Sequence, residues 1–207
     1  MDLWYPRAQL RLGPASKVWA DENTVRGIID HSADGAFEAS MFWLDDESVD
    51  EDNHYIAPSW HFFIRYDGSV YQHYPLNASP FHAGSRYWNT RLIGVEHEGK
   101  GPLTEQQLAA SIDLNRWIAQ QGDFPLSRGA HGPKSLFEHK EVSPATPCPS
   151  GRIPWDTYLG VDMPQIHLIK VGGSGLVGGV VTTTSAGVYE RVYDLGALGQ
   201  YKVVVEQ

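Results

Sequence analysis

The sequence predicts an α/β protein with a mixed central β-sheet flanked by helices and a small β-rich appendage at its C-terminal end. Strand-like runs rich in Val, Ile, Phe and Tyr alternate with segments of helical periodicity up to about residue 163. Beyond Pro164, a glycine-rich stretch at residues 172–179 leads into a run rich in Val, Thr and Tyr. We therefore expect a main domain over residues 1–163 and a small β-rich region over residues 164–207.

The composition of the 207-residue chain is that of a globular protein, with 42% hydrophobic residues and a formal net charge of −9. An acidic chain without a basic block binds phosphate backbones poorly, so we expect no nucleic-acid partner. No apolar run approaches the roughly 18 residues needed to cross a bilayer, and the first residues lack the pattern of a signal peptide. We therefore expect no membrane insertion, and synthesis in a host cytoplasm without a signal peptide.

The first strand of the main domain is expected over residues 25–31 and ends at His31, directly before a glycine-containing turn. A side chain at such a strand end is well placed to point into a cleft. Residues 36–47 carry apolar side chains at helical spacing, which predicts a helix. The acidic run over residues 45–52 is expected to be a solvated loop, because it lacks the ligand spacing of a calcium site.

The next part of the chain combines a hairpin, a buried strand and a long helix. Asp67-Gly68 lies between two β-rich runs and predicts a hairpin turn. Residues 92–98 read as a buried strand in which Glu96 is the unexpected residue, because a buried carboxylate without a partner is costly. A cleft in which the Glu96 carboxylate contacts a metal ion or a water molecule would explain its presence in this strand. A helix over residues 104–122 opens with a capping-box pattern.

The segment over residues 137–155 contains the only cysteine of the chain, Cys148, and a histidine upstream of it, His139. A thiolate and an imidazole are both good zinc ligands, and the prolines between them stiffen the loop. The pair forms half of a tetrahedral zinc site, which needs a third ligand and an open position for water. Taken alone, a single cysteine is more often a small buried hydrophobe than a ligand.

Several short motifs occur in an order that is informative as a set. They are His31, Trp60-His61-Phe62, His82-Ala83-Gly84, Asn89, Ile93-Gly94-Val95-Glu96 and the pair His139 and Cys148. With this order the chain resembles the zinc-dependent N-acetylmuramoyl-L-alanine amidases, a family shared by phage endolysins, bacterial autolysins and animal peptidoglycan recognition proteins. The resemblance covers roughly residues 20–160 and leaves the C-terminal tail outside it.

The resemblance implies that His31, His139 and Cys148 hold Zn²⁺, with water in the fourth position. It implies that Glu96 takes a proton from that water and passes it to the leaving amine. Thr146 matches the threonine of the catalytic recognition proteins, where it would donate a hydrogen bond to the oxyanion. The implied reaction is cleavage of the amide bond between N-acetylmuramic acid and the L-alanine of the stem peptide, so peptidoglycan is the implied substrate.

The resemblance also implies that Trp60, His82 and Asn89 contact the substrate along the groove. Two departures from the family pattern stand out. Trp60 occupies a position where many members have a tyrosine that helps to activate the zinc-bound water. Because tryptophan has no hydroxyl group, we expect Glu96 to carry more of that role here. The spacing from His139 to Cys148 is slightly longer than usual, which a proline-rich loop can accommodate.

Two other classes of function stay open at this point: a peptidoglycan-binding module without activity, and another zinc peptidase or amidohydrolase. The expected biological role is that of a phage or prophage endolysin that reaches the cell wall after release through a holin pore. The oligomeric state stays open, with a monomer as one candidate. For the tail over residues 164–207, structural packing or self-association ranks above wall targeting, because so small a β region buries little core of its own.

Overall fold

The structure is a computed structural model that describes residues 3–129, 133–159, 165–170, 190–194 and 200–206. The chain divides into two compact units, residues 1–154 and residues 155–207. The boundary predicted near residue 164 and the glycine-rich stretch at residues 172–179 lie outside the described residues.

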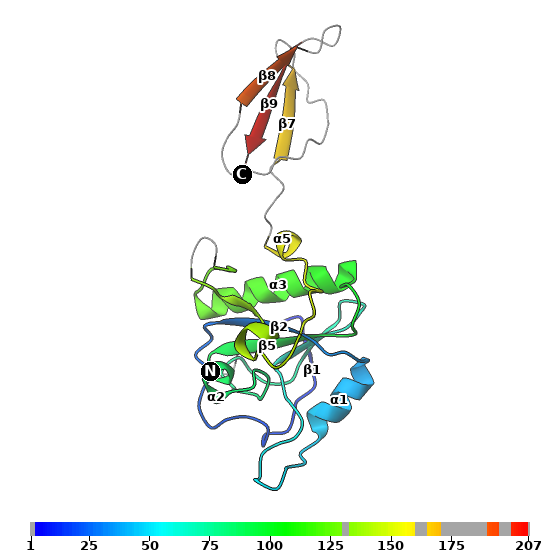
Figure 1. Cartoon of the computed structure of the whole chain (residues 1–207), viewed down its shortest axis with the longest axis vertical. Helices are drawn as coiled ribbons and strands as arrows, with labels where there is room; N and C mark the ends of the chain where they lie inside the picture. Colours follow the sequence, from blue (N-terminus) through cyan, green and yellow to red (C-terminus); the bar gives the residue numbers. More distant parts are fainter. Residues whose placement is uncertain (1–2, 130–132, 160–164, 171–189, 195–199, 207) are drawn as a thin grey trace. The chain divides into compact units, whose positions relative to one another are not determined.

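A six-stranded mixed sheet forms the centre of the first unit, with strand order β1-β4-β3-β5-β2-β6 (Figure 1). Neighbouring strands run parallel except for β3 and β4, which are antiparallel. The strands are β1 (Gln9–Leu10), β2 (Gly27–Ser32), β3 (Phe62–Ile64), β4 (Val70–Gln72), β5 (Leu92–His97) and β6 (Leu136–Glu138). This architecture confirms the mixed sheet expected from the sequence.

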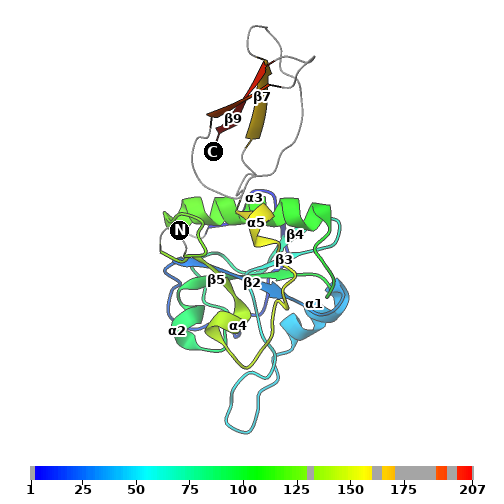
Figure 2. The ribbon, with the colours of Figure 1, turned by 45° about the horizontal axis from the view of Figure 1, so that its top comes forward.

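Helices lie on both faces of this sheet: α3 covers one face, and α1, α2 and α4 lie on the other (Figure 2). The helices of the first unit are α1 (Phe37–Asp45), α2 (Arg86–Asn89), α3 (Glu105–Gly122) and α4 (His139–Val142). A further short helix, α5 (Trp155–Tyr158), begins the second unit. None of the helices in the described residues has the length and apolar character needed to cross a bilayer.

The predicted hairpin and the predicted start of the long helix are both confirmed. Gly68 adopts a φ of 82°, a left-handed conformation that suits glycine, and the carboxylate of Asp67 accepts a hydrogen bond from the Ser69 N–H. At the start of α3 the Thr104 hydroxyl accepts a hydrogen bond from the Gln107 N–H. The Gln107 side chain in turn accepts one from the Thr104 N–H, which completes the capping box.

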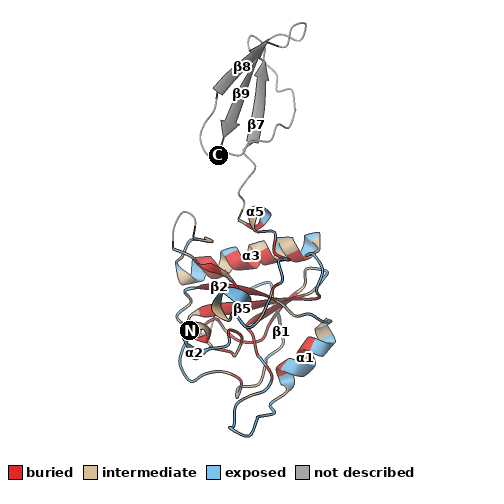
Figure 3. Cartoon of the chain, viewed as in Figure 1, coloured by how far each residue is buried: buried red, intermediate tan, exposed pale blue. Residues whose placement is uncertain are grey.

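The core lies where the central strands meet the helices, and Figure 3 shows β2 and β5 buried along most of their length. One apolar cluster includes residues of α1 and of the strands and loops beside it: Met41, Leu44, Trp60, Phe63 and Tyr74. The sequence of α3 predicts a buried apolar stripe of Leu108, Ile112, Leu114 and Ile118, but Leu108 and Ile112 are only half-buried, so the buried face of this helix differs from that stripe. Alongside Leu114 and Ile118 it carries a buried polar row: Gln107, Ser111 and Asn115.

The described residues of the second unit form a separate three-stranded antiparallel sheet with strand order β7-β9-β8. Its strands are β7 (Gln165–Lys170), β8 (Glu190–Asp194) and β9 (Gln200–Glu206). This sheet agrees with the β-rich appendage expected from the sequence.

Candidate metal centre

His31 lies near the end of β2, one of the central strands, and its ring is buried. In the parallel pairing of β2 and β5, His31 is directly beside Glu96, so the two side chains leave the same face of the sheet. The carbonyl oxygen of His31 accepts a hydrogen bond of 2.9 Å from Nδ1 of His97. This bond fixes the backbone that carries the His31 ring.

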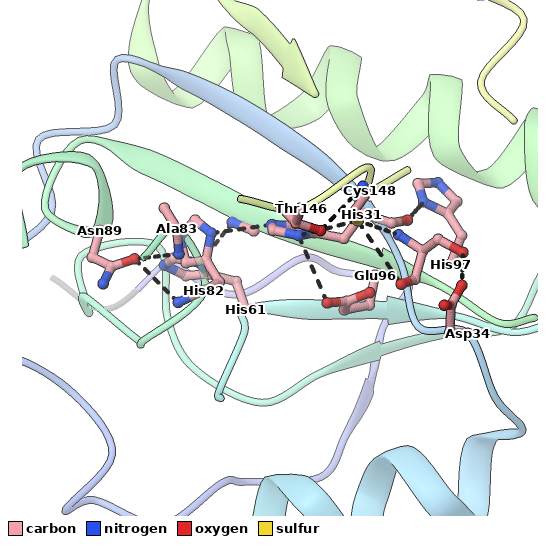
Figure 4. A network of polar contacts seen from close by, with 12 residues as sticks. His31, Asp34, His61, His82, Ala83, Asn89, Glu96, His97, Thr146 and Cys148 are labelled. Carbon is pink, nitrogen blue, oxygen red and sulfur yellow. Dashed lines mark hydrogen bonds and ion pairs between the residues drawn. The ribbon is translucent and has the colours of Figure 1, made fainter. Parts of the chain in front are cut away.

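The segment that follows β6, made of α4 and the loop after it, brings His139 and Cys148 to His31. The ligating atoms of these three residues all lie within 4.8 Å of one another. Sγ of Cys148 is 3.9 Å from Nδ1 of His31 and accepts a hydrogen bond of 3.2 Å from the Ser32 N–H (Figure 4). The Lys140 N–H donates to the carbonyl oxygen of Cys148 at 2.9 Å, which ties the two ends of the loop together.

The three side chains fit a zinc ion. Ligand atoms placed tetrahedrally at zinc–ligand distances of about 2.0–2.3 Å lie roughly 3.3–3.8 Å apart. The 3.9 Å between Sγ of Cys148 and Nδ1 of His31 is close to this range, and all three ligand atoms lie within 4.8 Å of one another. Nε2 of His139 is buried and has no hydrogen-bond partner among the described residues, so its bonding capacity is left for a ligand. His31, His139 and Cys148 are also the one group of three or more His, Cys, Asp or Glu in the described part of the chain that could hold a metal ion.

The protonation states of these groups follow from their burial. Burial lowers the pKa of His31 well below its usual value, and it lowers the pKa of His139 too. Burial, with a smaller contribution from the neighbouring Glu96, raises the pKa of the Cys148 thiol to about 12. Without a cation, the cluster therefore consists of two neutral imidazoles and a thiol. A bound metal ion would displace the thiol proton.

Glu96 stands beside the cluster, with its Oε1 at 3.8 Å from Nδ1 of His31. Its Oε2 is buried and has no hydrogen-bond partner among the described residues. The pKa of Glu96 is raised to about 8, mainly by burial and also by the charge of Asp34, while the charge of Arg152 opposes the rise. A carboxyl group whose pKa lies near neutrality is suited to taking and releasing a proton.

A hollow of about 330 Å³ opens next to Glu96, and Trp60 forms part of its wall. The Trp60 side chain is only 3% exposed, because most of it packs against Phe63 in the cluster beneath α1. The exposed indole of Trp43 lines another part of the same hollow. The structure thus places Trp60 at a cavity beside the cluster, while its contact with substrate stays a prediction.

Thr146 precedes Cys148 in the loop, and Figure 4 shows it beside Cys148 and His31. Its hydroxyl oxygen accepts a hydrogen bond of 3.2 Å from the Cys148 N–H. The hydroxyl hydrogen can still donate to another group, as the predicted oxyanion contact requires. The side chain is half-buried, so a substrate oxygen can approach it.

His82 and Asn89 are both buried, and both take part in hydrogen bonds within the protein. The side-chain oxygen of Asn89 accepts hydrogen bonds from the backbone N–H groups of His82 and Ala83, at 3.1 and 2.7 Å. This arrangement holds the loop that presents His82, whose Nδ1 lies 3.3 Å from Nε2 of His31 (Figure 4). The structure thus connects both residues to His31, and their contact with substrate stays a prediction.

Two supporting residues escaped the sequence reasoning, His97 and Arg152. The Arg152 guanidinium is buried and donates hydrogen bonds to the carbonyl oxygens of His97 and Glu98, at 3.0 and 2.8 Å, and to the Ser32 hydroxyl at 3.0 Å. Arg152 therefore joins the loop that carries Cys148 to the ends of β2 and β5. No motif pointed to Arg152, whereas a histidine inside the buried strand over residues 92–98 was a visible signal for His97.

Comparison with known proteins identifies the family. The family model described as N-acetylmuramoyl-L-alanine amidase matches residues 21–151, which is more than half of the chain, and the chain belongs to this family. A curated relative, N-acetylmuramoyl-L-alanine amidase CwlH from Bacillus subtilis (strain 168), is 29% identical over 124 residues. The match covers 47% of this chain and 49% of that protein, so the chain spans about half the length of this relative.

Solved structures with the same fold include the amidase LysC from Clostridium intestinale URNW, at 21% identity and a TM-score of 0.54. That match covers 74% of this chain and 95% of the other. A selenomethionine derivative of AmpD matches at 18% identity and a TM-score of 0.56, covering 78% of this chain and 98% of that one. At these identities the likeness establishes the fold, which is the fold that the sequence motifs implied.

Proposed function

We propose that the chain is a zinc-dependent N-acetylmuramoyl-L-alanine amidase that cleaves the amide bond between N-acetylmuramic acid and L-alanine in peptidoglycan. The observation that carries this proposal is the convergence of His31, His139 and Cys148 beside the buried carboxyl group of Glu96. The family match gives the class of substrate.

In this proposal His31, His139 and Cys148 hold the zinc ion. Zinc in such a site lowers the pKa of a bound water towards about 7 and polarises the scissile carbonyl. Glu96 accepts the proton of the attacking water and donates it to the leaving nitrogen of L-alanine, so that the amine departs neutral. Its position beside the cluster supports both halves of this proton transfer, and its burial, which favours the neutral form, helps it to hold the proton that it then donates.

Thr146 donates a hydrogen bond to the oxygen of the scissile carbonyl as negative charge develops there. The loop fixes the hydroxyl oxygen through the Cys148 N–H, so the remaining hydrogen has a restricted set of directions. The hollow beside Glu96, which Trp60 lines, is suited to bind the part of the substrate next to the scissile bond.

The biological role we propose is that of a phage or prophage endolysin. Two of the proteins with the same fold are described as endolysins, one from Clostridium intestinale URNW and one from Bacillus subtilis. The alternative of a non-catalytic peptidoglycan-binding module is disfavoured, because all three candidate ligands and Glu96 are in place.

The test is a set of matched variants assayed on purified sacculi, with zinc content measured for each protein. Cys148→Ser should lose both the metal and hydrolysis. Glu96→Gln should keep the metal and lose hydrolysis, because the amide has nearly the same shape but cannot accept the proton. Full hydrolysis by the metal-free protein would overturn the proposal, and zinc binding with wall binding but no hydrolysis would favour the binding module.

A further inference from the structure

A row of three buried histidines runs from the interior of the sheet to the metal centre: His61, His82 and His31 (Figure 4). The hydrogen-bond partners of each ring indicate which of its two nitrogens carries the hydrogen. Nδ1 of His61 receives a hydrogen bond of 3.1 Å from the Gly94 N–H, and its Nε2 lies 3.0 Å from the carbonyl oxygen of Ala78. A backbone N–H only donates and a carbonyl oxygen only accepts, so His61 carries its proton on Nε2.

The same reasoning fixes the proton of His82. Its Nε2 lies 3.1 Å from the carbonyl oxygen of Leu92, which only accepts, so Nε2 carries the hydrogen. Nδ1 of the neutral ring is then an acceptor, and it faces Nε2 of His31 at 3.3 Å. If His31 carried its proton on Nδ1 instead, two nitrogen lone pairs would face each other at this distance. The arrangement is favourable only when His31 carries its proton on Nε2.

We propose that His82 is a positioning residue for the metal centre: it fixes the Nε2–H tautomer of His31 and leaves the Nδ1 lone pair of His31 free for the metal. Nδ1 is the atom of His31 that lies 3.9 Å from Sγ of Cys148 and 3.8 Å from Oε1 of Glu96, on the side where the cluster converges. The hydrogen-bonded path thus starts at the Leu92 carbonyl oxygen and ends at the ligating atom. A fixed tautomer and ring orientation make a histidine a better metal ligand.

Gly94 provides a second observation for this role. A Cβ atom at Gly94 would lie 2.6 Å from Cγ and 2.7 Å from Nδ1 of His82, closer than side chains approach one another. The φ of Gly94 does not require glycine, so the reason for glycine at this place in β5 is the space that the His82 ring occupies. The strand that carries Glu96 therefore also accommodates the ring that orients His31.

The direct test uses the wild-type chain without metal, labelled with ¹⁵N-histidine. Two-bond ¹H–¹⁵N correlation spectra at neutral pH distinguish a protonated ring nitrogen from an unprotonated one. We expect His31 and His82 each to carry the hydrogen on Nε2. A His31 signal with the hydrogen on Nδ1 would overturn the inference, whether or not the protein binds zinc.

Variants at position 82 test the consequence for the metal. Asparagine and leucine have nearly the same shape, and only the asparagine oxygen can accept a hydrogen bond near the position of Nδ1. We expect His82→Leu to weaken zinc binding by about 10–100-fold and His82→Asn to stay within a few-fold of wild type, in line with the usual effect of a residue behind a ligand. Chelator competition measures both affinities. A buried histidine outside the row supplies the control: His73 contacts the Arg11 carbonyl oxygen instead, and His73→Asn should leave the affinity unchanged.

Equal zinc affinity for His82→Leu and wild type would contradict the inference. If His82→Leu fails to fold, Gly94→Ala displaces the His82 ring without changing its chemistry, and the same loss of affinity is expected. The inference rests on the metal site of the proposed function, yet the two fail differently. A wild-type chain that binds no zinc defeats the proposed function, whereas a zinc-binding chain with the other His31 tautomer defeats only the role of His82.

Discussion

Zinc binding to this chain should be steeply dependent on pH, and Glu96 should account for half of the dependence. At pH 7 the Cys148 thiol, with a pKa of about 12, is fully protonated, and Glu96, with a pKa of about 8, is about nine-tenths protonated. His31 and His139 are neutral and release no proton. A zinc ion next to these groups favours their charged forms, so its binding should release about two protons.

Affinity should therefore rise about 100-fold between pH 6 and pH 7 for the wild type, because each released proton contributes a factor of about 10 per pH unit. For Glu96→Gln the rise should be about 10-fold, since only the Cys148 proton remains. Calorimetric titrations in two buffers of different ionisation enthalpy count the protons directly, and chelator competition gives the affinities. The same rise of zinc affinity with pH in both proteins would show that the Glu96 proton is not released when zinc binds. An affinity that does not change with pH would also contradict the release of a proton from the Cys148 thiol.

The other predictions concern turnover and stability. Glu96→Gln should lower turnover on muropeptides by about 100-fold or more with zinc retained, the usual scale for a positioned general base; a loss of only a few-fold would assign the base elsewhere. Burial lowers the pKa of His61 to about 3 and of His73 and His97 to about 4. Because these pKa values lie below the unfolded value of about 6.5, the folded state resists protonation of the three rings. The free energy of unfolding should therefore be highest above pH 6.5 and should fall by about 2 kcal/mol per histidine between pH 7.5 and pH 5. Urea titrations at both pH values check it, and equal midpoints would contradict it. The Lys17 ammonium donates to the carbonyl oxygens of residues 43, 44 and 46 at the end of α1, at 2.8, 3.0 and 2.9 Å. Lys17→Met leaves these acceptors unpaired and should cost about 3 kcal/mol of unfolding free energy, whereas an unchanged urea midpoint would show that water replaces the ammonium.

The parts of the fold that local chemistry determines could be predicted from the sequence. The turn at Gly68 and the helix start at Thr104 each have a short-range cause, and the structure has both. The strands β1 and β6 could not be predicted, because elements of two and three residues carry no measurable periodicity. The helix α2 could not be predicted for the same reason, since its four residues form little more than one turn.

The candidate site shows the same division. His31 and Glu96 were visible as polar residues in strands that otherwise read as apolar, but only the pairing register shows that they lie side by side. The contact between His82 and His31 joins loops far apart in the chain, so no spacing in the sequence encodes it. Arg152 was missed because a buried guanidinium that binds backbone carbonyl oxygens has no sequence motif.

The most direct test of the proposed function is to identify the bond that the chain cleaves. Sacculi should be digested with the zinc-loaded protein, with the chelated protein and with Glu96→Gln, and the products analysed by mass spectrometry. We predict that only the zinc-loaded wild type releases stem peptides with a free L-alanine amino terminus and leaves glycan strands with intact N-acetylmuramic acid. Stem peptides still attached to sugar, with new termini inside the peptide or at the glycosidic bonds, would contradict the assignment of this chain as an amidase.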